Sequence, residues 1–463
     1  MKIPEGAREV IGALERAGYE AYLVGGCVRD MLLADEAGDG APAAHDWDVC
    51  TSARPAEVKR ALAPRRTLDT GLKHGTLTVL TPDGQYEVTT YRVDGSYSDG
   101  RHPDSVAFTA SLTEDLARRD FTINAIAMAP GAGEAPRALI DPFGGREDLR
   151  RRVLRCVGDP DARFGEDALR ILRAIRFASR FGLTVEQGTH DAMLRNRALL
   201  GRISAERVFS ELSGILVTER GGAYLRVYAD ILTGIIPELA PCVGFEQRNP
   251  WHCRDVFDHI MMSVAASPPE LTVRLTMLLH DIGKPAAASV DETGTGHFYG
   301  HQKVSAEIAQ TVLRRLHCPN RLLRCVVELV RCHDARVEPT ERALRRLLNR
   351  LGAEQARRLL AVKRADAMAQ SEKARGRIDE LALSEALLER IIAEHQAFSL
   401  KDLAIDGNDL IACGVAPGPE IGRRLRFALD AVLDGRVENE REALLAAALA
   451  GDAADGREIE VKK

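Results

Sequence analysis

The sequence has no run of apolar residues long enough to cross a membrane and no apolar segment near its first residue. We therefore expect neither a membrane span nor a secretory signal. The nine cysteines are odd in number and include no Cys-x-x-Cys pair. This pattern argues against both a disulfide framework and a structural zinc site. Together these absences predict a reduced, cytoplasmic protein.

An excess of positive charge is also missing. Lys and Arg number 63 against 68 Asp and Glu, so the formal net charge is −5. This balance excludes a generally basic nucleic-acid coat but leaves room for local basic surfaces. The content of hydrophobic residues (45%) and charged residues (28%) is ordinary for a folded protein, and 463 residues suggest about three domains.

The pattern of residues changes along the chain. Residues 1–150 mix strand and helix signals, with a hairpin turn expected at TPDGQ (81–85), whereas the pattern is helical from Phe164 onward. Two segments, 36–44 and 94–104, are rich in turn residues and are predicted to be mobile. Further breaks near residues 244–253 and 371–377 predict domain boundaries. We expect four parts: 1–150, 151–245, 246–372 and 373–463.

Two carboxylates flank Trp47 in a predicted strand. Because side chains alternate between the faces of a strand, Asp46 and Asp48 are expected to point the same way. Two like charges on one face repel each other unless a cation lies between them. Mg²⁺, which is held by one or two carboxylates and substrate phosphates, is the natural candidate.

A glycine turn precedes this pair. Gly25 and Gly26 lie between a predicted strand and a predicted helix, with Arg29 in the first turn of that helix. Backbone N–H groups at such a turn, together with the helix dipole and a nearby guanidinium, can hold a phosphate. The combination of a Gly-Gly turn with a following Asp-x-Asp is far more specific than either feature alone.

With these motifs, the sequence resembles the polymerase β-type nucleotidyltransferases, specifically the class II tRNA CCA-adding enzymes and bacterial poly(A) polymerases. The resemblance implies that Asp46 and Asp48 are catalytic metal ligands and that Gly26, Arg29 and Arg119 contact the nucleotide. It rests on five motifs in order: GGCVRD (25–30), DWD (46–48), RRDFTINA (118–125), DPFGGREDL (141–149) and EDALRILRAIRF (166–177).

The last of these motifs offers a pair that can read a base. On a predicted helix, Asp167 and Arg170 share a face, which fits either a surface ion pair or a base-reading pair. A carboxylate accepts and a guanidinium donates, so the pair complements the amine and ring acceptor of C and A and refuses U and G. The resemblance assigns this templating role to Asp167 and Arg170, with Arg173 and Arg176 continuing toward the triphosphate.

A second set of metal-binding residue types lies in residues 246–372. His280 and Asp281 are adjacent at the end of an apolar helix, with His259 and Asp366 at a distance along the chain. This arrangement resembles the HD phosphohydrolase superfamily, which implies a metal site formed by these four residues. The resemblance adds His301 and His333 as ligands of a second metal, with His252 outside them. The expected chemistry is attack of metal-activated water on a phosphate ester.

The C-terminal segment is predicted to be helical and to contact RNA. Gly418 and Gly422 are expected near a helix start, followed by Arg423 and Arg424, where a backbone phosphate could bind. Simple helix capping is an equal alternative. This segment also resembles the C-terminal region of the tRNA-processing family.

The expected fold is α+β. A nucleotidyltransferase head with a mixed sheet (1–150) precedes an all-α neck and body (151–245), a helical HD domain (246–372) and a helical RNA-binding tail (373–463). The expected function is addition of C, C and A to tRNA 3′ ends from CTP and ATP, with Mg²⁺ in the head and a second divalent metal in the HD domain.

Three alternatives remain at this level. The protein could add only A, as a poly(A) polymerase or A-adding enzyme, or only CC. It could be an HD phosphohydrolase whose head only binds RNA, or a nucleic-acid-binding protein without activity. The segment 94–104 favours the full CCA activity, because a switch from C to A needs a movable element. The third catalytic carboxylate is not assignable from spacing.

Overall fold

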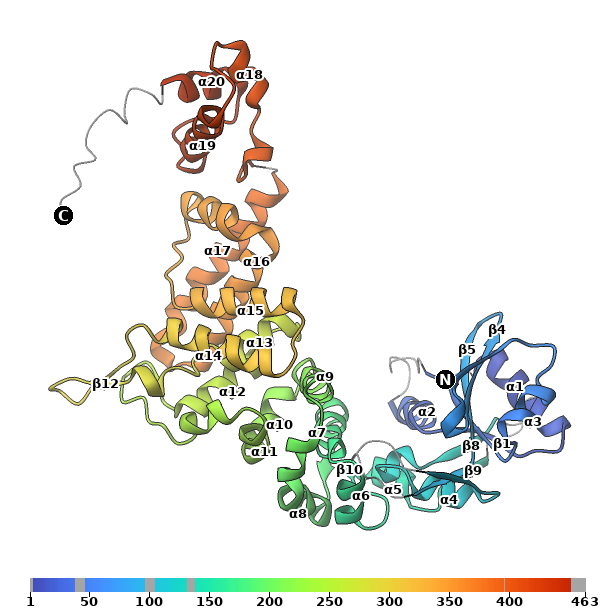
Figure 1. Ribbon diagram of the computed structural model, residues 1–463. Helices are drawn as coiled ribbons and strands as arrows, with labels where there is room; N and C mark the ends of the chain where they lie inside the picture. Colours follow the sequence, from blue (N-terminus) through green and yellow to red (C-terminus); the bar gives the residue numbers. More distant parts are fainter. Residues whose placement is uncertain (1–2, 38–45, 96–104, 131–137, 395, 451–463) are drawn as a thin grey trace. The chain divides into compact units, whose positions relative to one another are not determined.

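The computed structural model describes residues 3–37, 46–95, 105–130, 138–394 and 396–450 (Figure 1). Most of the two segments predicted to be mobile lies outside these residues. The chain divides into two compact units, residues 1–237 and 238–463. No helix among the described residues is long and apolar enough to cross a membrane.

The first unit begins with a seven-stranded mixed sheet of order β3-β4-β5-β2-β1-β8-β9. Only β2 and β5 pair in parallel, and the other neighbours are antiparallel. The expected hairpin is present, with Thr81 opposite Gly84. The strands are β1 (Ala21–Val24), β2 (Asp48–Thr51), β3 (Thr67–Gly71), β4 (Thr76–Thr81), β5 (Gly84–Thr90), β8 (Ala127–Ala129) and β9 (Ala138–Ile140).

Helices and short strands complete this part of the first unit. Buried Val24, Cys50, Tyr91 and Leu116 form one core beneath the sheet. The elements are α1 (Glu5–Arg16), α2 (Gly26–Ala37), α3 (Pro55–Ala61), η1 (Leu72–His74), β6 (Arg92–Asp94), β7 (Val106–Phe108), α4 (Leu112–Ala117), η2 (Thr122–Asn124) and α5 (Gly145–Arg150).

The remainder of the first unit is almost wholly helical. The predicted apolar stripe of α7, which includes Leu169, Leu172 and Ile175, is buried, and α7 packs against α9. The elements are β10 (Val153–Leu154), α6 (Pro160–Glu166), α7 (Leu169–Phe181), β11 (Thr184–Val185), α8 (Gln187–Asn196), η3 (Arg197–Arg202), α9 (Ala205–Leu216), α10 (Gly221–Val227) and α11 (Ala229–Ile235).

The second unit is a stack of helices with one small hairpin. A left-handed Gly352 kinks α16, and the core between α16 and α17 is built from leucines such as Leu344, Leu359 and Leu388. The elements are η4 (Pro237–Cys242), α12 (Val256–Ala266), α13 (Leu271–Leu279), η5 (Pro285–Ala287), β12 (Ser289–Val290), β13 (Gly296–His297), α14 (His301–Arg315), α15 (Asn320–Cys332), α16 (Glu341–Ala369), η6 (Glu372–Ala374) and α17 (Arg375–Ala393).

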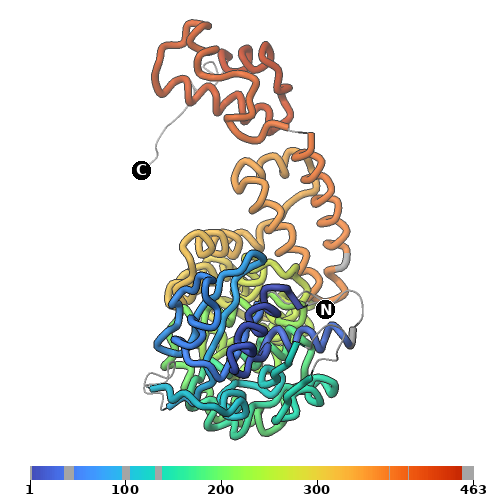
Figure 2. The backbone as a smooth tube through the Cα atoms, turned by 90° about the vertical axis from the view of Figure 1, so that its right-hand side faces the viewer, coloured from blue at the N-terminus to red at the C-terminus, as the bar shows by residue number. Residues whose placement is uncertain are grey.

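The last described residues form a small helical bundle with its own core, which includes Leu410, Leu429 and Leu444 (Figure 2). Its elements are η7 (Leu400–Asp402), α18 (Gly407–Ala412), α19 (Pro419–Leu433) and α20 (Arg441–Ala450). The expected glycines lie at a helix start. Gly418 caps α19, Gly422 lies in its first turn, and Arg423 and Arg424 both pair with Glu420. Contact of this turn with RNA stays a prediction.

The fold class expected from the sequence, a mixed-sheet head followed by helices, is confirmed. The four boundaries expected from composition stay predictions.

Candidate active sites

The carboxylates of the head meet across the only parallel pairing of the sheet. Asp48 is the first residue of β2 and lies opposite Glu87 of β5. Asp46 precedes β2 and is exposed, so the expected strand does not extend to it. Glu87, which is also exposed, is a third carboxylate that spacing along the sequence could not assign.

The charges at this edge of the sheet fit a divalent cation. The pKa of Asp48 is raised to about 6. Burial is the main cause of this rise, Arg119 opposes it, and the negative charges of Glu87 and Asp46 add to it. A set of oxygen donors that repel one another in this way matches a hard cation such as Mg²⁺, which would favour the charged form of Asp48.

A tight turn lies beside these carboxylates. Gly25 has a left-handed φ of +78°, and a Cβ atom there would lie 2.9 Å from Nη1 of Arg119. Only glycine therefore allows both the turn and the close approach of the guanidinium. Gly26 begins α2, as expected. Nε of Arg119 is buried without a hydrogen-bond partner among the described residues, while Nη2 lies 3.6 Å from Asp115.

The side chain of Arg29 is buried, whereas a side chain that contacts a ligand at the protein surface would be more exposed. It is 5% exposed, donates a 2.6 Å hydrogen bond to Oδ1 of Asn124 and pairs with Asp30 at 2.8 Å. Its guanidinium also lies over the ring of Phe181, 4.5 Å from the centroid. These contacts tie α2 to α7, and the expected nucleotide contact of Arg29 stays a prediction.

The base-reading pair does not sit on one continuous helix, which corrects the sequence-based expectation. Asp167 is extended (φ −145°, ψ 101°) and separates α6 from α7. Its Oδ1 accepts from the backbone N–H of Leu169, because an Asp side chain readily caps a helix start. Its Oδ2 accepts from Arg207 at 2.7 Å, and Arg170 pairs instead with Glu166 at 2.5 Å.

Arg173 and Arg176 follow on the same face of α7. Arg173 donates to Asp120 at 2.6 Å, and Arg176 donates to Glu211 at 2.7 Å. Burial raises the pKa of Asp120, but Arg173 and a hydrogen bond from Asn124 outweigh it and hold that pKa at about 2. Both guanidiniums, together with that of Arg29, lie within 5.2 Å of the ring centroid of Phe177.

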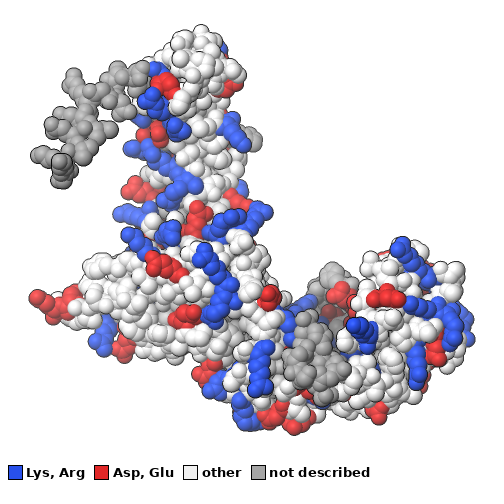
Figure 3. All heavy atoms as spheres, in the orientation of Figure 1, with Lys and Arg blue, Asp and Glu red and all other residues white. Residues whose placement is uncertain are grey.

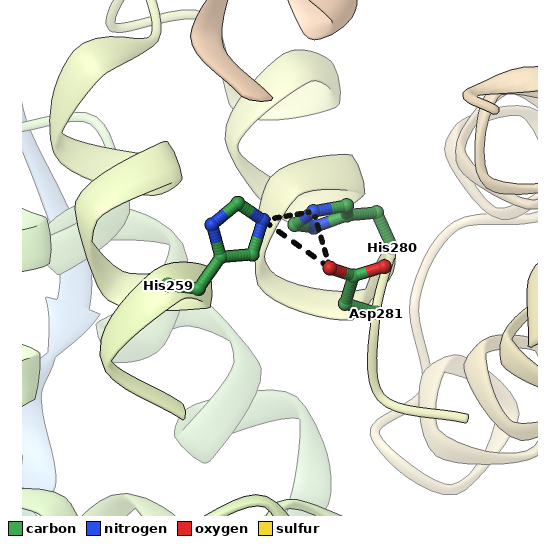
Figure 4. A group of neighbouring side chains, drawn as sticks. All are labelled: His259, His280 and Asp281. Atoms are coloured by element: carbon green, nitrogen blue, oxygen red, sulfur yellow. Dashed lines mark hydrogen bonds and ion pairs between the residues drawn. The ribbon is translucent and has the colours of Figure 1, made fainter. Parts of the chain in front are cut away.

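The second unit brings six expected ligands into one cluster, which we call the HD cluster. Asp281 lies between two groups of histidines. Its Oδ2 is 3.2 Å from Nε2 of both His259 and His280 (Figure 4), and its Oδ1 is 3.2 Å from Nε2 of His301 and 3.6 Å from Nε2 of His333. The sixth member, Asp366, lies 3.0 Å from Nε2 of His259. Every member except Asp366 is buried.

The backbone orients these histidines. Nδ1 of His280, His301 and His333 each lies 2.7–2.8 Å from the carbonyl oxygen three residues earlier. A carbonyl only accepts, so Nδ1 carries the proton and Nε2 presents a lone pair to the cluster. The facing Nε2 atoms are 3.3 Å apart for His259 and His280, and 3.2 Å apart for His301 and His333.

Lone pairs and carboxylates that converge in this way need a cation between them. Burial lowers the pKa of His280, but Asp281 and Asp366 raise it to about 10, so a proton can supply that charge. A metal ion binds at the same lone pair and competes with the proton. Two groups of possible ligands share Asp281 and could hold divalent cations: His259, His280 and Asp281, and Asp281, His301 and His333. Asp366, 3.0 Å from Nε2 of His259, could add an oxygen ligand to the first group.

Sequence reasoning missed Lys284, although it stands three residues after Asp281 in the same HDIGK stretch. Its buried Nζ lies 2.6 Å from Oδ2 of Asp281 and 2.8 Å from Oε1 of Gln247. His252, expected outside the ligands, lies 3.3 Å from the same Nζ. Lys284 therefore holds the bridging carboxylate in its charged form, and the short spacing to Asp281 was the available signal.

A cavity of about 540 Å³ opens onto the HD cluster. Asp281, His301, His333 and Asp366 reach its wall, and the rest of the wall comes largely from residues 249–252 and 295–302. A small molecule can therefore approach the cluster from solvent.

Comparison with known proteins identifies the family. The chain is 36% identical to the CCA-adding enzyme of Lactobacillus delbrueckii subsp. bulgaricus over 95% of this chain and 96% of that one. The chain belongs to the CCA-adding enzyme family. The CCA-adding enzyme of Lactiplantibacillus plantarum is 35% identical and covers 95% of both chains. The resemblance expected from the sequence is thus confirmed.

Family models and solved structures agree with this membership. Residues 21–155 match a poly(A) polymerase head domain, 182–243 an RNA- and SrmB-binding site of polymerase A, and 298–448 tRNA nucleotidyltransferase domain 2. The structure of the Bacillus stearothermophilus CCA-adding enzyme with CTP matches over 98% of both chains, with a TM-score of 0.72 and 31% identity. A Thermotoga maritima CCA-adding enzyme complexed with tRNA shares the fold, with a TM-score of 0.60 and 20% identity.

Proposed function

We propose that this member of the CCA-adding enzyme family adds C, C and A to the 3′ end of tRNA from CTP and ATP, without a nucleic-acid template. The observation that carries the proposal is the meeting of Asp46, Asp48 and Glu87 beside Arg119. The family membership supplies the substrates. A cytoplasmic location stays a prediction from the composition.

In this reaction the 3′-oxygen of the RNA forms a bond to the α-phosphorus of the nucleotide. The bond from that phosphorus to the bridging oxygen breaks, pyrophosphate leaves, and the hydroxyl proton passes to solvent. Asp46, Asp48 and Glu87 would hold Mg²⁺, which supplies charge for the attacking and leaving oxygens. Arg119 places a fixed positive charge beside Asp48, and the turn at Gly25 leaves room for it.

For base choice we propose that Asp167 and Arg170 read the incoming nucleotide. Asp167 would accept from the amine of C or A, and Arg170 would donate to the neighbouring ring nitrogen. Support comes from Arg207 and the N–H of Leu169, which fix the Asp167 carboxylate in one orientation. In this structure Arg170 pairs with Glu166, the residue before Asp167.

The tRNA would also contact the second unit. On the face shown in Figure 3, Lys and Arg side chains gather over the region of α15 to α17. Exposed Arg321, Arg324, Arg346 and Arg350 belong to these helices. A local surface of this kind can attract phosphates although the net charge is −5.

One experiment tests the product. The protein is incubated with Mg²⁺ and single nucleotides on tRNAs that end before CCA, at C, or at CC, and the products are sized. We expect two C additions from CTP alone and one A addition only on the tRNA ending in CC. A long A tail would identify a poly(A) polymerase, and addition restricted to A or to CC would identify a partial enzyme.

We further propose that the HD cluster is a metal-dependent phosphohydrolase. Two divalent ions held by its six residues would lower the pKa of a bound water. The water oxygen forms a bond to the phosphorus, the ester P–O bond breaks, and the leaving oxygen takes up a proton. The position of Asp281 between the two groups of histidines supports this proposal. Release of inorganic phosphate from phosphate esters with Mg²⁺, Mn²⁺ or Ni²⁺ added in turn tests it, with His280→Ala as the inactive control.

A further inference from the structure

Three guanidiniums gather around the ring of one phenylalanine in the first unit. Those of Arg29 and Arg173 lie 5.2 Å from the ring centroid of Phe177, and that of Arg176 lies 4.9 Å from it. Three positive charges at this spacing repel one another, whereas the negative face of an aromatic ring attracts each of them. The ring, which is 6% exposed, therefore gives the three charges a shared contact at the edge of the core.

This contact joins two helices that are far apart in the chain. Arg29 is in the first turn of α2, directly after the glycine turn, whereas the other two guanidiniums come from α7. The guanidinium of Arg29 also lies over Phe181 of α7, and the rings of Phe177 and Phe181 are stacked with an interplanar angle of 13°. Two neighbouring rings of α7 thus hold the side chain that follows the glycine turn.

The other contacts of these side chains are spread over separate elements. Phe121, which is fully buried, supports the ring of Phe177 edge to face at a centroid distance of 5.9 Å. Each guanidinium also pairs with a carboxylate of its own, and the pairs are Arg29 with Asp30 at 2.8 Å, Arg173 with Asp120 at 2.6 Å and Arg176 with Glu211 at 2.7 Å. The carboxylates balance the charges one by one, and the ring brings them together.

The two helices joined in this way carry the two halves of the proposed nucleotide site. The glycine turn before Arg29 is the expected phosphate site, and α7 begins two residues after Asp167, the proposed base reader. A ligand that binds at both places gains affinity when their separation matches its own length, because the second contact is then intramolecular. The distance between α2 and α7 therefore bears on the binding of a whole nucleotide.

We propose that Phe177 is a positioning residue for nucleotide addition, whose ring holds the guanidiniums of α2 and α7 together and so sets the separation between the phosphate turn and the base-reading pair. This inference rests on the nucleotide addition proposed above and adds a residue to it. Phe177 acts through the three guanidiniums and not through contact with the nucleotide.

Fluorination of the ring tests this role while the shape of the core is kept. Mono-, di- and trifluorophenylalanine, placed at position 177 by amber suppression, withdraw electron density from the ring face step by step. We expect the KM values for CTP and ATP to rise with each fluorine, to roughly 2- to 30-fold in the trifluoro protein, the range for a lost cation–π contact. The KM for tRNA should change less than about twofold. A role in packing alone would leave all these values flat.

Two partial ligands separate positioning from a general loss of binding. Tripolyphosphate offers only the phosphate half of CTP, and cytidine offers only the base half. In the trifluoro protein the inhibition constants of both should change less than about twofold at constant free Mg²⁺, because neither spans the two helices. Equal weakening of CTP and tripolyphosphate would place the effect in the phosphate contacts alone and would overturn the proposed role.

Matched variants complete the test. Trifluorophenylalanine at position 164 is the control, since Phe164 is fully buried in α6 of the same unit, and its KM for CTP should be that of wild type. Phe177→Leu keeps an apolar side chain without a π face, so it should raise the KM for CTP at least as much as the trifluoro ring does. A wild-type KM in either the trifluoro protein or Phe177→Leu would overturn the proposal.

The role of Phe177 and the proposed function fail in different ways. If the wild-type protein adds no nucleotide to any tRNA, the addition function is wrong. Calorimetry of CTP binding with Ca²⁺ across the fluorinated series then decides whether Phe177 positions a nucleotide. If the wild-type protein adds C and A, and the fluorinated proteins do so with unchanged KM values, the addition function stands and the role of Phe177 is wrong.

Discussion

The carboxylates of the head and the HD cluster are built in opposite ways. In the head, Asp46 and Glu87 are exposed, and the proposed metal ligands come from two neighbouring strands and the segment before one of them. In the HD cluster, Asp281 is 2% exposed, and backbone carbonyls orient three of the four histidines.

The two proposed metal sites thus differ in how far their side chains are oriented before a ligand binds. The head carboxylates have few partners of their own, so the nucleotide and the RNA must complete their surroundings. That suits an enzyme that accepts two different nucleotides in succession. The HD cluster is oriented in advance, so it suits one reaction on ligands that fit the cavity.

The strongest test of this comparison is a double dissociation. Combining Asp46→Ala with Asp48→Ala should reduce nucleotide addition at least about 100-fold, because the charge on the reacting oxygens is no longer balanced. Phosphate release by the HD cluster should be unchanged. Combining His280→Ala with Asp281→Ala should abolish phosphate release and leave nucleotide addition unchanged. Radiolabelled CTP incorporation and phosphate release measure the two activities.

Circular dichroism of each double variant supplies the folding control. Equal loss of both activities in a well-folded His280→Ala, Asp281→Ala protein would mean that the HD cluster supports the head structurally. If the Asp46→Ala, Asp48→Ala protein adds nucleotides at more than a few per cent of the wild-type rate, the assignment of these two residues as metal ligands is wrong.

A smaller effect is expected in base choice. Arg170→Ala should increase UTP and GTP incorporation relative to CTP and ATP, since the donor to the ring nitrogen is gone. The free energy of discrimination should fall by about 1–3 kcal/mol. Asp167→Ala should weaken C and A addition together. Competition among all four nucleotides on a tRNA without its CCA end measures the preference.

Arg195→Ala is the matched control, because Arg195 pairs with Asp161 on an exposed part of the same unit. It should keep the wild-type preference. An unchanged preference in both the Asp167 and Arg170 variants would falsify the templating role.

The smallest effect concerns stability of the first unit. The pKa of Asp120 is about 2 in the folded protein against an ordinary value of 3.8. This lowered pKa contributes about 2 kcal/mol that is fully present above pH 3.8 and is lost as the pH falls toward 2. Asp120→Asn should therefore unfold at lower urea at pH 7, and the difference from wild type should shrink below pH 4.

Trp47 reports on this unit when Trp251 is replaced by Phe in both proteins. Glu219→Gln serves as the control, because Glu219 of the same unit is exposed and its replacement should leave the urea midpoint nearly unchanged. A difference between wild type and Asp120→Asn that stays constant from pH 7 to pH 3 would contradict the assigned ionisation.

The sequence predicted those site residues whose partners are close in the chain or whose types are rare. The HD cluster illustrates this, since only 12 of the 463 residues are histidines and all six expected residues meet. Glu87 was not predictable, because it faces Asp48 only through a parallel pairing of strands separated by β3 and β4.

Local geometry explains the other miss. The apolar periodicity of residues 164–177 favoured one helix, but the capping bond from Leu169 to Asp167 makes a break more stable there. Periodicity records which residues are buried, and it does not record which backbone N–H groups find a side-chain acceptor.

The parallel pairing of β2 with β5 also ties the chemistry of the head to a turn far from it in the chain. Side chains of β5 alternate between faces, so a slip of one residue would replace Glu87 opposite Asp48 with Tyr86 or Val88. β5 begins at the hairpin that closes between Thr81 and Gly84, and Asp83 in the turn accepts a 2.9 Å hydrogen bond from the N–H of Gly6. If an insertion in that surface turn displaced β5 along β2, it would move Glu87, the proposed third carboxylate, away from Asp48.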